Sequence, residues 1–213
     1  MALIRRLWIF SVLLGLCMIL QGPVVMAAEL PPANTQGTDR KWLDVPYATE
    51  SASQKLDIYL PKEGKGPFPV ILAIHGGAFY TGDKGNMEVD GQLVGLNHGY
   101  AVVSMNYRLS NEATFPAPVL DAKAAVRFLR AHAAEYQLDG QRIAAWGDSA
   151  GPNIAALLGT TAGHPEFEDL SQGNAGESSR VAAVVAWFPP VDYLQEDAQF
   201  RARGITPFAW ADK

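Results

Sequence analysis

Cysteine and positive charge are both scarce in this 213-residue chain. Cys17 is its single cysteine, so no disulfide can form within the chain. Lys and Arg number 17 against 22 Asp and Glu, for a formal net charge of −5. No cluster of Lys and Arg follows residue 27. Nucleic acid binding is therefore not expected, since it depends on neutralising phosphates, and the protein must be held together by its hydrophobic core.

Long apolar runs are confined to the N-terminus. Two arginines precede the apolar stretch 7–20, and the small residues of VVMAAEL follow it. This order of basic, apolar and small residues predicts a secretory signal peptide over residues 1–27. A membrane anchor is the alternative, although the run is short for a span of about 20 residues. A lipoprotein signal is disfavoured because Leu16, directly before the cysteine, is too large for it.

Cleavage of the signal peptide changes the charge of the chain. Two of the 17 basic residues and no acidic residue lie in it, which leaves 15 against 22 and a net charge of −7. The single cysteine is lost as well, although an exported protein is free to form disulfides. We expect a bacterial periplasmic or secreted protein with no stable membrane anchor after cleavage. Residues 28–41 are predicted as a polar leader and 42–213 as one domain; the oligomeric state is not indicated.

Strand and helix patterns alternate along the predicted domain. Four continuously apolar runs predict strands that are buried on both faces: 69–74, 100–107, 142–147 and 181–187. The segment 54–61 alternates and ends in proline, which predicts an edge strand. A helix is predicted before Gly99, where glycine ends it. The alternation predicts an α/β fold with a mostly parallel sheet and helices on both faces.

The clearest helical periodicity lies in residues 122–136. Apolar residues recur there at spacings of three and four, which predicts one buried helix face. Lys123, Arg127 and Arg130 fall on the other face, as in a helix that is charged on its outer side. A polar loop is predicted over 163–180, before the fourth apolar run.

The segment GDSAG, from Gly147 to Gly151, lies between a predicted buried strand and a predicted helix. This is the strand–turn–helix setting of a nucleophile elbow, with Ser149 as the nucleophile. Side chains at the two glycine positions would collide with the neighbouring strand and helix. We expect a strained backbone at the serine and a partial positive charge from the helix N-terminus beneath it. The alternative is a glycine-rich turn with a solvated serine.

The segment HGGAF follows the strand at 69–74 and precedes the serine by about seventy residues. A loop at this place supplies part of an oxyanion hole in an elbow-type hydrolase. We predict that the N–H groups of Gly77 and Ala78 act there, together with that of Ala150. Each such donor is typically worth about 2.7–4 kcal/mol in the transition state. His75 and Gly76 are predicted to shape the loop, with His75 orienting it by hydrogen bonding rather than acting as the base.

These two motifs do not stand alone. Together with QKLDIYLP, the stretch NYRLS to GDSAG, and FPPVDY, they resemble the α/β-hydrolase esterases of the hormone-sensitive-lipase-like and BD-FAE-like (feruloyl/acetyl esterase) group. The resemblance covers nearly all of residues 43–195. It implies a secreted carboxylic ester hydrolase that works through an acyl-enzyme on Ser149, without metal or cofactor. The implied substrate is a small-molecule or carbohydrate-linked ester. Pro152 departs from the family's usual glycine, at a helix position that tolerates proline.

The sequence does not show the acid and the histidine that a serine nucleophile needs. In this fold the acid and then the histidine follow the nucleophile, but His164 is the only later histidine and lies about 15 Å away along a helix. Asp192 follows the fourth strand, where the family's residue is usually structural. The resemblance places the catalytic Asp and His after two further strands. We therefore expect an N-terminal portion or truncated reading frame, nearly inactive and prone to aggregation.

Two other functions remain open from the sequence. The absent histidine favours a non-catalytic binding or interaction protein on a hydrolase scaffold, although such a protein needs neither an elbow nor an oxyanion loop. The HGGAF loop is also compatible with an arylformamidase or a peptidase-type hydrolase. The fold does not decide the substrate.

Overall fold

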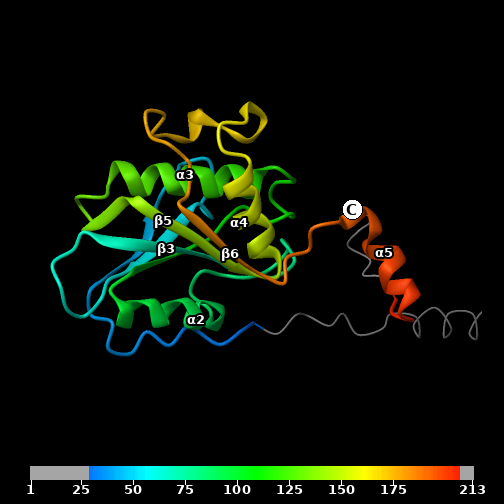
Figure 1. Cartoon of the computed structure of the whole chain (residues 1–213), viewed down its shortest axis with the longest axis horizontal. Helices are drawn as coiled ribbons and strands as arrows, with labels where there is room; N and C mark the ends of the chain where they lie inside the picture. Colours follow the sequence, from blue (N-terminus) through cyan, green and yellow to red (C-terminus); the bar gives the residue numbers. More distant parts are fainter. Residues whose placement is uncertain (1–28, 207–213) are drawn as a thin grey trace, which may run out of the picture.

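The computed structural model describes residues 29–206, which form a six-stranded sheet between helices (Figure 1). The strand order is β1-β2-β4-β3-β5-β6. β1 with β2 and β2 with β4 are antiparallel, whereas the pairs β3–β4, β3–β5 and β5–β6 are parallel. The predicted α/β fold with a mostly parallel sheet is thus confirmed. The predicted signal peptide lies outside the described residues.

Five of the six strands lie at predicted positions, whereas the first, β1, was not predicted. The six strands are β1 Lys41–Pro46, β2 Lys55–Tyr59, β3 Phe68–Ile74, β4 Ala101–Met105, β5 Leu138–Asp148 and β6 Ala183–Trp187. The prediction of an edge strand at 54–61 is wrong, because β2 lies between β1 and β4. Asp57, a charged residue of this strand, is buried and pairs with Lys84 at 2.8 Å.

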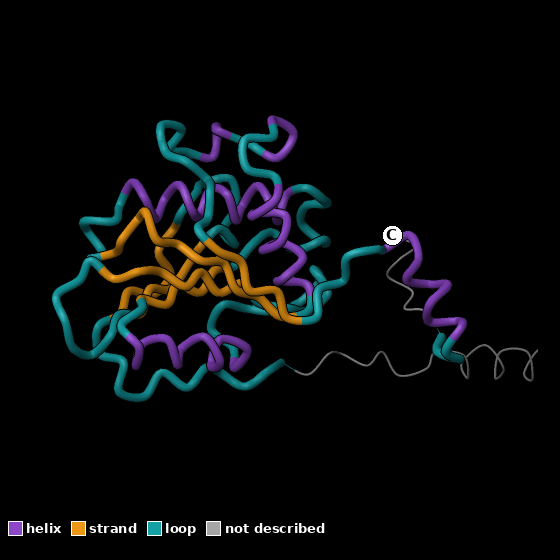
Figure 2. Tube along the Cα trace, in the orientation of Figure 1, coloured by secondary structure: helices purple, strands orange, loops and turns teal. Residues whose placement is uncertain are grey.

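Helices cover both faces of the sheet (Figure 2). On one face lie α3, Ala117–Ala131, and α4, Ala150–Thr160. On the other lies a continuous helical segment of η1 Met87–Val89, α2 Asp90–Leu93 and η2 Val94–His98. Gly99 ends this segment in the left-handed conformation, with a φ of 79°, as predicted. No helix within 29–206 is long and apolar enough to cross a membrane.

The leader segment packs against the loop before η1. The N–H of Ala33 donates to the carbonyl of Gly85, and that of Asn34 donates to the carboxylate of Asp90. In Figure 1 this blue segment runs along the α2 side of the molecule. The leader is therefore folded onto the domain from about residue 31.

The main core lies between α3, α4 and the sheet, and it includes Leu72, Val103, Leu129 and Ile143. The prediction that α3 has a charged outer face is wrong at two positions, since Lys123 and Arg127 are fully buried. The reason is the loop after α4, which contains η3 Pro165–Phe167 and η4 Leu170–Gln172. Its residue Glu168 pairs with both cations, so this polar loop covers the face that the periodicity assigned to solvent.

β6 occupies one edge of the sheet and is exposed along its length. The prediction that this strand is buried on both faces is wrong; Trp187, for example, is 48% exposed. α4 packs on one face of β6, but among residues 29–206 no strand pairs with its outer edge. The chain then leads to α5, Tyr193–Ala202, which stands away from the sheet in Figure 1.

Candidate active site

Ser149 lies at the turn where β5 ends and α4 begins. Its φ of 60° and ψ of −107° are rare for a residue with a side chain and imply a strained backbone. The serine is exposed, and its hydroxyl caps none of the N–H groups of α4. The turn thus presents the hydroxyl on the surface, above the positive end of a helix.

Both glycines of the turn are sterically required. A Cβ on Gly147 would overlap the carbonyl carbon of Gly151 and lie 2.6 Å from the nitrogen of Pro152. A Cβ on Gly151 would overlap the carbonyl oxygen of Ile74, at the end of β3. The first glycine therefore lets β5 approach the start of α4, and the second lets α4 approach β3.

The loop after β3 carries three consecutive left-handed residues. Gly77, Ala78 and Phe79 have φ values of 94°, 59° and 63°. The carbonyl of Gly77 accepts from the N–H groups of Tyr80 and Thr81, at 3.0 and 2.9 Å, which closes the turn. The N–H groups of Gly77 and Ala78 donate to no acceptor within the described chain. They are therefore available to a ligand.

His75 anchors the base of this loop and points into the protein. It is 5% exposed, its Nδ1 lies 2.8 Å from the carbonyl oxygen of Gly76, and its ring stacks on Tyr107 at 4.4 Å. The Tyr107 hydroxyl donates to the carbonyl of His75 at 3.0 Å. Burial lowers the pKa of His75, which favours the neutral ring. A Cβ on Gly82 would overlap this ring, so the loop also passes close over it.

The loop and the elbow meet at Gly76. A Cβ at this position would lie 3.0 Å from the carbonyl oxygen of Asp148, 3.1 Å from Glu88 Oε1 and 3.2 Å from Ser149 Cβ. Because Gly76 has no side chain, the loop that carries these N–H groups can lie close to the serine. Burial, and secondly the charge of Glu88, raise the pKa of Asp148 to about 6.

No hydrogen bond joins a described histidine to the serine; His75 points into the protein, and His98 ends η2. His164 lies beyond the far end of α4, against the ring of Phe167, and His132 pairs with Glu135 at the end of α3. Asp192 caps α5, where it accepts from the N–H of Gln195. The structure therefore brings the serine, the elbow glycines and the loop together, but not a base or an acid. Among residues 29–206, no group of three His, Cys, Asp or Glu side chains is placed to hold a metal ion.

Some residues around the site have no signal of their own in the sequence. Tyr107 and Gly82 support His75, and Glu88 reaches the loop from η1. Phe79 lies edge-on to Tyr193, with ring centroids 6.4 Å apart. Apart from that of Gly82, which lies in the same loop as His75, these contacts join separate segments of the chain, so only the fold reveals them.

Known proteins resemble this chain in sequence and in structure. A carbohydrate esterase from gut microbiota, solved in a truncated form, is 34% identical with a TM-score of 0.71, over 83% of this chain and 64% of that one. A bifunctional GH43-CE protein of Bacteroides eggerthii is 39% identical with a TM-score of 0.66, over 75% of this chain and 22% of that one. The probable carboxylic ester hydrolase LipM of Mycobacterium tuberculosis is 31% identical over 154 residues.

The sheet order, the elbow and these structural neighbours define an α/β-hydrolase of the esterase group. The family model BD-FAE matches residues 56–207, and the chain belongs to this family. The match with LipM covers 71% of this chain but 35% of LipM, so the chain spans about a third of that relative's length.

Proposed function

We propose that this chain carries the nucleophile and the oxyanion donors of a carboxylic ester hydrolase. One observation carries the proposal: Ser149 has the strained backbone of an elbow and lies beside a loop whose N–H groups at Gly77 and Ala78 are unbonded within 29–206. The N–H of Ala150, at the first position of α4, adds a third donor, because that position has no acceptor within the helix. Membership of the BD-FAE family supports this assignment.

The proposed reaction is acyl transfer to Ser149. Its Oγ attacks the ester carbonyl carbon, and the carbonyl oxygen becomes an oxyanion held by the N–H groups of Gly77, Ala78 and Ala150. The Ser149 proton passes through water to the alcohol oxygen as the bond between that oxygen and the carbonyl carbon breaks, and a second water then hydrolyses the acyl-enzyme to the free acid and the serine hydroxyl. None of the described histidines is hydrogen-bonded to the serine, as a base that accepts its proton would be. Oxyanion stabilisation alone accelerates such reactions by about 10³–10⁴ over water, so we expect slow turnover by this chain.

The proposed substrate is a carboxylic ester, including esters carried by carbohydrates. The resemblance to a carbohydrate esterase at 34% identity supports the second class. A carbohydrate substrate also fits the export that residues 1–27 predict. An acetylated oligosaccharide and a free aryl acetate, compared at equal concentration, would measure the preference.

A fluorophosphonate probe, which phosphonylates activated serines, tests the assignment of the nucleophile. We expect label on the peptide that contains Ser149, and loss of this label in Ser149→Ala. Ser110→Ala is the matched control, since Ser110 is exposed and its N–H bonds to Phe79 of the same loop. Label that survives Ser149→Ala would contradict the proposal.

A non-catalytic binding protein is the second candidate. The absence of a histidine beside Ser149 within the described chain favours it. A binding protein would take up no label at any pH. It would still retain an ester analogue by equilibrium binding, and Ser149→Ala would leave that affinity unchanged.

A further inference from the structure

The segment that leads from β6 to α5 lies along one side of the elbow. The carbonyl of Trp187, the last residue of β6, accepts from the N–H of Ser149 at 3.3 Å. The carbonyl of Pro190 accepts from Asn153 Nδ2, in the first turn of α4, at 2.9 Å. These two bonds hold the segment against the turn that presents the serine hydroxyl.

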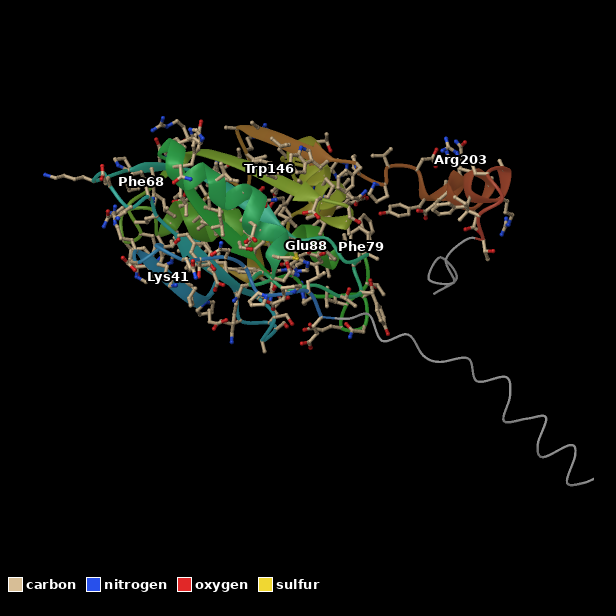
Figure 3. The ribbon with its side chains drawn as sticks, turned by 90° about the horizontal axis from the view of Figure 1, so that it is seen from below. Lys41, Phe68, Phe79, Glu88, Trp146 and Arg203 are labelled. Atoms are coloured by element: carbon tan, nitrogen blue, oxygen red, sulfur yellow. The ribbon has the colours of Figure 1, made fainter. Side chains whose placement is uncertain are left out.

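Tyr193, the first residue of α5, brings an aromatic ring to the loop that carries the proposed oxyanion donors. Its ring lies edge-on to that of Phe79, with centroids 6.4 Å apart and planes at 61°. Phe79 directly follows Ala78 and is partly buried against the core. Figure 3 shows Phe79 at the end of the sheet domain from which the chain leads out to Arg203, just past α5. Since the loop and the segment after β6 both contact the elbow, the two rings form an aromatic wall beside Ser149, the Phe79–Tyr193 wall.

The wall is open to water on one side. Tyr193 is 46% exposed, and its hydroxyl makes no hydrogen bond within residues 29–206. Burial, and secondly the charge of Glu196, raise the pKa of Tyr193 to about 12, so the phenol stays protonated and can donate. A flat hydrocarbon ring placed here would leave its far face in water. A sugar ring fits better, because it presents C–H groups to the aromatic face and keeps its oxygens toward water and the phenol.

The charges around the wall disfavour an anionic ligand. Asp192 directly precedes Tyr193, and Glu196 lies one turn further along α5. Arg201, the one base of α5, already pairs with Asp197 at 2.9 Å. A sugar that carries a carboxylate would therefore meet like charges, so the fitting ligand is an uncharged sugar.

We propose that the Phe79–Tyr193 wall binds the alcohol part of the ester as an uncharged sugar ring, and that it thereby determines the specificity of the site. Tyr193 contacts the sugar, and Phe79 holds the Tyr193 ring in place. The inference rests on the proposed function, which supplies the ester and the nucleophile. Neither residue takes part in making or breaking a bond.

Binding of glucose pentaacetate to the full chain carrying Ser149→Ala tests the wall without turnover. Titrations followed by saturation-transfer NMR give the Kd. In this background, Tyr193→Leu should weaken binding by about tenfold and Tyr193→Phe by less than about threefold, because phenylalanine keeps the ring. Leu194→Ala is the matched control, since this neighbour is exposed, and should leave the Kd unchanged. No binding to Ser149→Ala, or an equal Kd for Tyr193→Leu, overturns the proposal.

A double-mutant cycle tests the support that Phe79 gives to Tyr193. Phe79→Leu should weaken binding of glucose pentaacetate by about threefold, and by much less when Tyr193→Leu is already present. Tyr80→Ala is the matched control, because this exposed ring of the same loop makes no ring contact within the described chain. Additive effects of the two substitutions overturn the role of Phe79.

Phenyl acetate distinguishes a sugar wall from a wall that binds aryl groups. Its affinity for Ser149→Ala should change by less than about twofold on Tyr193→Leu, since a bare ring gains little at an open surface. A larger loss for phenyl acetate than for glucose pentaacetate overturns the assignment to a sugar.

Fluorophosphonate labelling separates this proposal from the proposed function. A probe with a small alkyl group does not reach the wall, so it should label Tyr193→Leu at the wild-type rate, which also shows that the variant is folded. Loss of label in Tyr193→Leu alone means that this residue positions the elbow, and overturns the proposal. Absence of label in the wild type contradicts Ser149 as the nucleophile, while the binding results still decide on the wall.

Discussion

Glu168 holds the loop after α4 onto the buried face of α3. Its two carboxylate oxygens pair with Lys123 Nζ at 3.1 Å and Arg127 Nη1 at 2.9 Å, and Ser179 Oγ donates to it as well. Both cationic side chains are fully buried, whereas that of Glu168 is 20% exposed. Glu168→Gln keeps the shape of the side chain and removes the anion that compensates two buried cations.

The structure sets the size of the effect. Removal of one partner from a buried ion pair typically costs about 3–5 kcal/mol. The cations keep other acceptors here: Lys123 donates to the carbonyl of Thr161, and Arg127 to the carbonyls of Asp169 and Gly173. The partial exposure of Glu168 also weakens the interaction. We therefore expect Glu168→Gln to lower the free energy of unfolding by about 2–3 kcal/mol.

Urea unfolding followed by tryptophan fluorescence measures this difference. Glu166→Gln is the matched control, because Glu166 is exposed on the same loop and has no side-chain hydrogen bond or ion pair within 29–206. It should change stability by less than about 0.5 kcal/mol. Limited proteolysis should cut Glu168→Gln first within 161–180. A loss below about 0.5 kcal/mol at low salt would refute the view that these cations depend on Glu168.

Single substitutions elsewhere test the same physical reasoning. Gly151→Ala should lose at least about 3 kcal/mol by urea unfolding, since a Cβ overlaps the β3 backbone, whereas Gly176→Ala has open space and should change little. Tyr107→Phe should lose about 1–2 kcal/mol and slow labelling of the elbow serine. Because the pKa of Asp148 is raised to about 6, the wild type loses stability as the pH rises through that value. Asp148→Asn lacks this loss, so its free energy of unfolding relative to that of the wild type should be about 1–2 kcal/mol higher at pH 8 than at pH 4.5 in thermal melts. Val185→Lys should reduce self-association in light scattering, because it places a charge on the exposed edge.

The order of strands and helices was predictable because hydrophobic runs and periodicity report burial directly. The runs at 69–74, 100–107 and 142–147 became the parallel centre of the sheet. The run at 181–187 has the same composition but lies at an edge, since apolar character does not reveal how many neighbours a strand has.

The burial of charged residues was not predicted where their ion-pair partners lie far along the chain. Lys123 was predicted on the outer face of a helix, and Asp57 lies in a strand that was predicted at the sheet edge, yet each is buried against an opposite charge. Lys84 and Glu168 supply those charges from loops that no periodicity describes. The sequence contains both partners, but only the fold pairs them.

The local geometry of the candidate site followed from steric reasoning. The need for glycine at 147 and 151 and the strained serine between them are properties of a tight strand-to-helix turn. Glu88 and Tyr107 escaped notice because their roles depend on packing behind the turn. A glutamate in a short helix and a tyrosine after a strand are ordinary residues until the fold places them beside His75.

The contact of Gly151 with Ile74 makes the serine a reporter of folding. The φ of 60° at Ser149 is unfavourable by itself and persists only while α4 is pressed against β3. A local opening that separates these two elements would let the turn relax long before the sheet unfolds. A probe that labels only the serine of the intact turn would therefore lose its target when this junction opens, so a fall in the labelling rate under mild denaturant would report that opening before the sheet unfolds.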